Sequence, residues 1–103
     1  MSLLFEFSMT PLDKGESVST YVARSLDIID KSGLPYKLGP MGTCLEGEWD
    51  DCMAVIKECL TTMQTDCNRI TLSVKMDYRK GKTDRLTGKI ESVEKKLGRP
   101  VKV

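Results

Sequence analysis

The sequence offers the hydrogen-bonding and charged residue types of a ligand site, but it contains no histidine. A Ser–His–Asp triad, a Cys–His pair and a histidine-ligated metal are therefore excluded. The cysteines at 44, 52, 59 and 67 show no C-x-x-C spacing, which argues against a zinc site or a redox pair. We expect no metal and no cofactor, and we interpret the cysteines as reduced thiols, with Cys52 and Cys59 in the core.

The segment Gly42–Gly47 (GTCLEG) is the second place where residue types point to chemistry. Two glycines bracket a short predicted strand, and glycine permits positive φ or close approach of a ligand to the backbone. Thr43 can donate and accept hydrogen bonds, while Glu46 can accept two or balance a cation. Two interpretations stay open: a ligand-contacting segment, and a hairpin whose glycines serve geometry only.

Two longer segments alternate with the period of two that a half-buried strand requires, at 3–10 and 69–79. One face of this predicted sheet is apolar. The other face is polar and carries Glu6, Ser8, Thr10, Thr71, Ser73, Lys75 and Asp77. This face is either solvated or packed so that it encloses a polar small-molecule site. Its short hydroxyls favour the second reading, because exposed sheets usually carry more lysine, glutamate and arginine.

The remaining elements follow from helical periodicity, caps and breakers. Helices are predicted at about 17–32, with Ser17 as cap and Gly33 as terminator, at 49–65, and from Thr83 or Asp84 to Leu97. Short strands are predicted at 35–40, an edge strand, and at 42–47. The order β-α-β-β-α-β, then α, predicts an α+β, ferredoxin-like two-layer sandwich with an extra C-terminal helix. Two helices should cover one face of a four-stranded antiparallel sheet. The tail 99–103 is either a frayed end or a short added strand.

Composition limits the class of partner. A chain of 103 residues with 40% hydrophobic and 30% charged residues is expected to form a single globular domain, 1–103. The net charge of +1 excludes a strong electrostatic footprint for nucleic acid or an anionic membrane. No apolar run approaches the roughly 18 residues of a membrane span. No signal peptide is visible, so we expect a cytoplasmic protein.

Five blocks of the sequence resemble one family, with their spacing preserved across nearly the whole chain. They are F-S-M-T-P-L (7–12), S-V-S-T-Y-V-A (17–23), S-G-L-P-Y (32–36), G-P-M-G-T-C-L-E-G (39–47) and K-M-D-Y-R (75–79). The chain resembles the small thiamine-binding proteins, which are related to the YkoF proteins, and G-T-x-x-E-G is the most specific block. The resemblance implies a ferredoxin-like fold and a homotetramer built from dimers. It also implies binding of thiamine or its hydroxymethylpyrimidine half, without known catalysis.

On this resemblance the candidate ligand-binding residues are Ser8, Thr10, Thr43, Glu46, Asp77, Arg79 and Tyr36. Glu46 or Asp77 could hold the ring amine and a ring nitrogen, or balance the thiazolium cation. The three hydroxyl residues could form a polar rim, and Tyr36 could stack on a ring. Arg79 could meet the phosphate of thiamine phosphate, or pair with Asp77 structurally. Trp49 and Tyr78 could also stack, but both continue apolar stripes and are expected in the core.

Other functions fit the sequence less well. An acylphosphatase of this topology needs an arginine in the loop after the first strand and a positioning asparagine. The loop 11–16 has no arginine, and Asn68 is the only asparagine. An RNA-binding sheet would expose stacking aromatics, which the polar face lacks. Metal carriage would need paired thiols after the first strand. A self-assembling structural or regulatory module that binds another small ligand remains the alternative.

Overall fold

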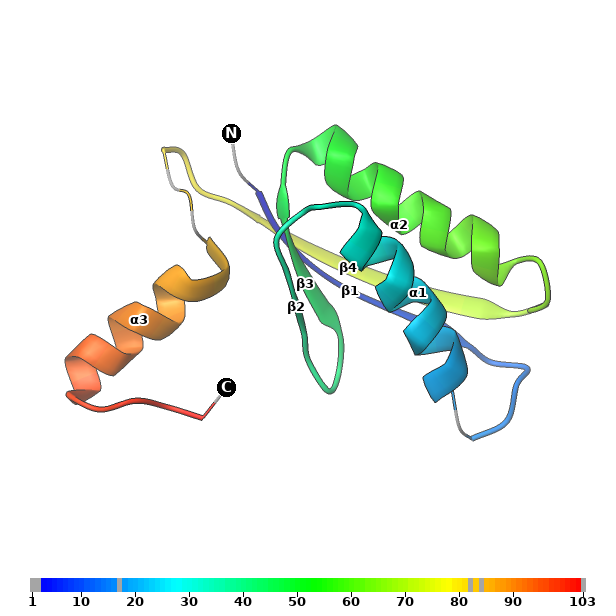
Figure 1. The fold of residues 1–103 in the computed structure, drawn as a ribbon, viewed down its shortest axis with the longest axis horizontal. Coiled ribbons are helices and arrows are strands. Elements are labelled where there is room, and N and C mark those ends of the chain that lie inside the picture. Colours follow the sequence, from blue (N-terminus) through cyan, green and yellow to red (C-terminus); the bar gives the residue numbers. More distant parts are fainter. Residues whose placement is uncertain (1–2, 17, 82, 84, 103) are drawn as a thin grey trace.

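The computed structural model describes residues 3–16, 18–81, 83 and 85–102 (Figure 1). Its elements are β1 (Leu3–Pro11), α1 (Ser19–Lys31), β2 (Tyr36–Leu38), β3 (Thr43–Gly47), α2 (Trp49–Met63), β4 (Ile70–Tyr78) and α3 (Arg85–Leu97). The predicted α+β order is therefore confirmed. The predicted caps at Ser17 and Asp84 lie outside the described residues. Gly33 and Gly98 take φ of +78° and +75°, as the predicted helix ends require.

The sheet has four antiparallel strands in the order β2-β3-β1-β4, the ferredoxin-like arrangement. β2 lies at an edge, as its prolines predict, and Gly39 N donates to Gly42 O at 2.8 Å to close the β2–β3 hairpin. β1 runs one residue further than predicted, to Pro11. Pro11 has no backbone N–H to donate, but the pairing of β1 with β4 continues past it. The next residue, Leu12, donates its N–H to Arg69 O at 2.7 Å.

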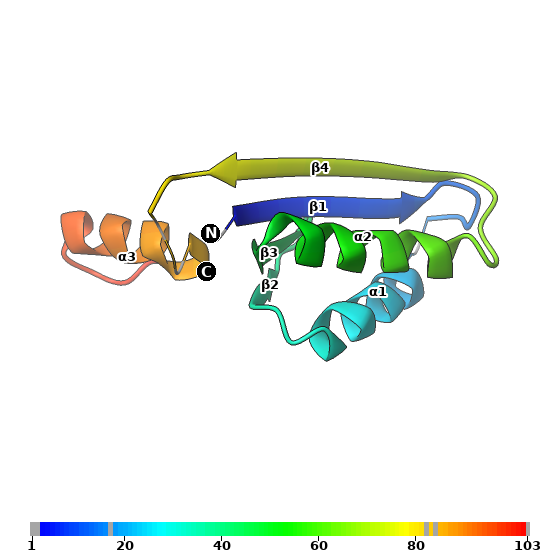
Figure 2. The same cartoon turned by 90° about the horizontal axis from the view of Figure 1, so that it is seen from above.

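The core lies between the sheet and the two helices α1 and α2, which pack on the same face (Figure 2). Phe5 and Leu45 from neighbouring strands are fully buried there, together with Cys52 and Cys59 of α2, as predicted for these thiols. Burial of a large apolar side chain contributes about 1.5–3 kcal/mol. Trp49 was expected in the core, but it begins α2 at the edge of the core and is half-exposed. Its ring centroid lies 5.7 Å from that of Phe5.

The apolar side of β4 is on the predicted face but is not covered. Val74 pairs with Phe7 and Met76 with Phe5, so their side chains share the helix side of the sheet. They are nevertheless 41% and 40% exposed, and Tyr78 is half-exposed rather than in the core. The reason is that α1 and α2 pack over β1 and β3, while β4 is the outer edge strand. The two helices thus lie on one face of the sheet, as predicted, but they leave the apolar side of β4 largely uncovered beyond Ile70, which packs against the core.

α3 extends beyond the end of the strands, away from the two-layer body (Figures 1 and 2). None of its described residues is buried. The radius of gyration is 15.0 Å, against about 13 Å for a compact chain of this length. After α3 the chain turns back, and Val101 N donates to Glu94 Oε2 at 2.8 Å. Residues 99–102 therefore form no added strand.

Candidate functional site

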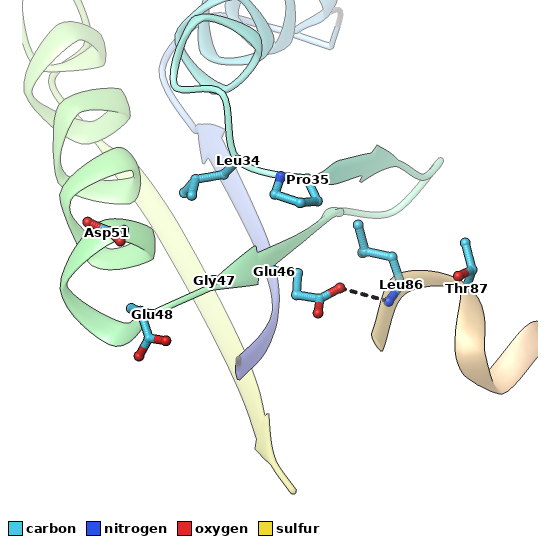
Figure 3. A pocket seen from close by; sticks show the side chains of 8 residues that line it. All are labelled: Leu34, Pro35, Glu46, Gly47, Glu48, Asp51, Leu86 and Thr87. Atoms are coloured by element: carbon cyan, nitrogen blue, oxygen red, sulfur yellow. Dashed lines mark hydrogen bonds between the residues drawn. The ribbon is translucent and has the colours of Figure 1, made fainter. Parts of the chain in front are cut away.

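Glu46 lies where the sheet meets the first turn of α3. Its neighbour Leu45 faces the core, so Glu46 projects from the opposite side of β3, the open face of the sheet. Glu46 is nevertheless only 7% exposed. Its Oε1 accepts a hydrogen bond from the backbone N–H of Leu86 at 3.2 Å (Figure 3). A carboxylate is stabilised at this position because the first N–H groups of a helix lack partners and carry partial positive charge.

A pocket of about 410 Å³ opens beside Glu46, and we call it the acidic pocket (Figure 3). Its lining residues are Leu34, Pro35, Glu46, Gly47, Glu48, Asp51, Leu86 and Thr87. Apolar side chains from the α1–β2 connection and from α3 form part of its wall. Three carboxylates add negative charge, and none of the described lysines and arginines lines it. Apolar walls with a few convergent polar groups are typical of small-molecule sites, and this charge suits a cationic or amine-bearing ring.

A second pocket of about 880 Å³ lies between the open face and α3, and we call it the basic pocket. Its lining residues are Leu4, Glu6, Cys44, Lys75, Asp77, Arg79, Thr83, Arg85, Gly88, Lys89 and Ser92. Four of these side chains are cationic and two are carboxylates. Asp77 forms its ion pair with Arg85, whose side chain is 11% exposed. The proposed pairing of Asp77 with Arg79 is therefore not the one that the structure shows.

The glycines of the G-T-x-x-E-G block serve close packing. A Cβ at Gly42 would lie 3.0 Å from Phe7 O, and one at Gly47 would lie 3.2 Å from Cys52 Sγ. Neither glycine has a positive φ. Close packing is thus enough to explain the two glycines, without contact to a ligand. It does not extend to Glu46, whose side chain leaves the opposite face of the strand.

The sequence-predicted residues fall into three places. Glu46 lines the acidic pocket, while Asp77 and Arg79 line the basic pocket. Ser8 and Thr10 lie further along the open face, paired with Ser73 and Thr71, and line neither pocket. They are therefore separated from the carboxylates with which they were grouped.

Thr43 and Tyr36 belong to the helix side of the sheet. Thr43 is buried and pairs with Phe7. It lies three residues before Glu46 in the same strand, so its side chain points to the opposite face from that of Glu46. Tyr36 pairs with Leu45, and its hydroxyl donates to Asp30 Oδ1 at 2.8 Å. This hydrogen bond to the carboxylate raises the pKa of Tyr36. Neither residue reaches the pockets, so the structure does not support their grouping with Glu46.

The pocket residues that the sequence analysis missed come mainly from the α1–β2 connection and from α3. Leu34 and Pro35 stand inside a recognised block but carry no chemical group that would mark them. Arg85, Leu86 and Lys89 belong to a helix with no place in a two-layer sandwich. This extra amphipathic helix is the sequence feature that could have pointed to these residues. A helix that is not part of the two-layer core must place its apolar side against another surface.

The thiols are not set up as nucleophiles. All four cysteines are free. Burial raises the pKa of the Cys52 thiol to about 11. Burial, and then the nearby Glu6 carboxylate, also raise the pKa of Cys44, which lines the basic pocket. In the described part of the chain no cluster of three or more metal-ligating side chains occurs, and no helix there is long and apolar enough to cross a membrane.

Comparison with known proteins gives a consistent assignment. A family model described as thiamine-binding protein matches residues 5–94. A UPF0045 protein of Mycobacterium bovis is 38% identical over 101 residues, which cover 97% of this chain and 99% of the relative. A hypothetical protein of Methanocaldococcus jannaschii has a crystal structure with a TM-score of 0.78 at 36% identity, covering 94% of this chain and 96% of that one. A candidate thiamine biosynthesis/salvage protein of Thermotoga maritima shares the fold, with a TM-score of 0.79 at 22% identity over 90% of this chain and 99% of its own.

Proposed function

The chain belongs to the thiamine-binding protein family, and we propose that it binds thiamine or its hydroxymethylpyrimidine half without catalysing a reaction on it. The observation that carries this proposal is the acidic pocket, in which buried Glu46 stands between apolar walls. Thiamine presents a permanent thiazolium charge and an aminopyrimidine ring with donors and acceptors. An apolar, negatively charged pocket is complementary to both features.

Each wall of the acidic pocket has a distinct part in this proposal. Leu34, Pro35 and Leu86 offer apolar surface to a flat ring, and Glu46 offers a carboxylate acceptor to the ring amine. Glu48 and Asp51 add negative potential that favours a cationic ligand. The site supplies hydrogen bonds and charge, and no cysteine is among its lining residues. This inventory supports carriage, storage or sensing of the ligand rather than its conversion.

We also propose that the protein self-associates through β4. The outer edge of this nine-residue strand pairs with no other strand among the described residues. Its apolar side chains Leu72, Val74 and Met76 are about two-fifths exposed. A long apolar edge strand normally pairs with another chain or must be protected from doing so. A second copy of this chain would cover both the edge and the apolar side chains.

Isothermal titration calorimetry with thiamine and with hydroxymethylpyrimidine tests the ligand proposal. We expect saturable binding of at least one of them, and Glu46→Gln should weaken it at least tenfold. Glutamine can still accept the hydrogen bond from Leu86 N, so this variant removes the charge while keeping the contact with α3. Glu58→Gln, an exposed position of α2 outside both pockets, is the matched control.

The outcomes separate the site from the function. Equal losses in Glu46→Gln and Glu58→Gln, or no loss in either, would remove Glu46 from the site. If the folded protein bound neither compound, the proposed ligand would be wrong.

A further inference from the structure

We propose that the basic pocket binds a phosphate monoester, so that the preferred ligand is a cationic ring compound that carries a phosphate. The identity of the ring rests on the proposed function, which places the ring of the ligand in the acidic pocket. The phosphate subsite rests on the features of the basic pocket and does not depend on the proposed function. The chemical class that satisfies both is a thiamine phosphate ester.

Part of the positive charge in the basic pocket remains unbalanced. Asp77 is paired with Arg85, and the other carboxylate, Glu6, stands opposite Lys75 in the β1–β4 register. Of the four cations in the lining, only Arg85 therefore has an ion-pair partner among the described residues, and Lys75, Arg79 and Lys89 have none. Two cations that converge on one cavity from different elements suit a dianion. Charge-assisted hydrogen bonds to phosphate are stronger than hydrogen bonds between neutral groups.

The two pockets share one helical turn, because different residues of that turn line each of them. Arg85 and Gly88 line the basic pocket, while Leu86 and Thr87 between them line the acidic pocket. The first turn of α3 thus separates a wall of carboxylates from a wall of cations. A ligand with a positive ring and a negative phosphate has the complementary separation of charge.

The basic pocket has open space at Gly88. This glycine lies in the helical segment of α3, and a Cβ added there would meet no atom within 4 Å. The helix therefore presents bare backbone to the cavity beside Lys89. A phosphate can approach the pocket at this point without displacing a side chain.

The test compares affinity for thiamine monophosphate with affinity for thiamine, by calorimetry on the full chain. We expect the wild-type protein to bind the phosphate ester at least tenfold more tightly. In the double variant Arg79→Ala/Lys89→Ala this ratio should fall to near one. Lys95→Ala/Lys96→Ala is the matched control, because it removes the same charge from exposed positions of α3 outside both pockets. The control should keep the wild-type ratio.

Inorganic pyrophosphate provides an arm that does not depend on the ring. Equal affinities for thiamine and its monophosphate in the wild-type protein would overturn the inference, as would an equal loss in both double variants. If neither thiamine compound bound, the proposed function would fail. In that case saturable binding of pyrophosphate that only Arg79→Ala/Lys89→Ala abolishes would still support the anion subsite. Absence of pyrophosphate binding would then overturn the subsite as well.

Discussion

At the scale of single residues, carboxylates act differently according to what the fold places against them. Glu46 is buried beneath the first turn of α3, whereas Asp66 lies in the connection after α2 and is partly exposed. Both oxygens of Asp66 accept hydrogen bonds from the Arg24 guanidinium of α1, each at 3.0 Å. The same guanidinium lies 4.8 Å above the ring of Tyr21. Asp66 therefore links α1 to the connection after α2, and the hydrogen bonds from Arg24 lower the pKa of Asp66 from its ordinary value.

This lowered pKa predicts a specific dependence of stability on pH. A carboxyl group whose pKa is lower in the folded state stabilises the fold above its unfolded pKa, near 3.8. That contribution is lost as the pH falls through the lower, folded value. Asp66→Asn should therefore reduce the free energy of unfolding at pH 7, and wild type and variant should converge in strong acid. Urea unfolding at both pH values measures this, and a difference that stays constant with pH would contradict it.

At the scale of elements, α3 differs from the two core helices. It has apolar residues at helical spacing, Leu86, Ile90, Val93 and Leu97, but none is buried. Its contacts with the sheet include β3 and β1, and Arg85 in its first turn pairs with Asp77 of β4. With little tertiary burial to stabilise it, α3 depends on its intrinsic helix propensity more than α1 or α2 does.

Replacement of Gly88 should show this dependence. Gly88→Ala should stabilise α3 by up to about 1 kcal/mol, because alanine has the higher helix propensity and its Cβ meets nothing. Gly98→Ala should instead destabilise the end of the helix by about 1 kcal/mol, because Gly98 has a φ of +75°. Hydrogen exchange of the α3 amides measures both effects. Slower exchange in both variants, or in neither, would show that local propensity does not control this helix.

At the scale of the whole molecule, the chain is elongated, with extents of 46 × 29 × 21 Å. Its uncovered apolar surfaces include the helix side of β4 and part of α3. Monomers seldom expose a long apolar edge strand, and this is the basis of the proposed self-association.

Val74→Lys should therefore reduce the mass of the protein in solution. A lysine on the apolar side of β4 would place charge in the proposed contact between two copies. Ser73→Lys adds the same charge on the opposite face of the same strand and serves as the control. Light scattering after size exclusion measures the mass. A monomeric wild-type protein would contradict self-association, and a loss of mass only in Ser73→Lys would move the interface to the open face.

Much of the fold follows from local patterns. The alternation of Phe5, Phe7 and Met9, and the helical spacing of Cys52, Ile56 and Cys59, predict elements whose apolar sides are buried as expected. Gly33 ends its helix because it takes a positive φ, which glycine adopts without the steric cost of a side chain. Such features depend on neighbours along the chain, so the sequence by itself determined the element order, the faces and the prominence of Glu46.

Tertiary structure alone decided what lies against those faces. Alternation along β3 places Thr43 and Glu46 on opposite faces. It could not show that Tyr36 shares the face of Thr43 or that Glu46 meets α3, because this depends on the register between strands and on the path of the chain. It could not show that α1 and α2 leave β4 uncovered, because coverage depends on the strand order β2-β3-β1-β4. Periodicity is a local property, whereas pockets form where distant segments meet. Leu34, Glu46 and Leu86 become neighbours in the acidic pocket only through the path of the folded chain.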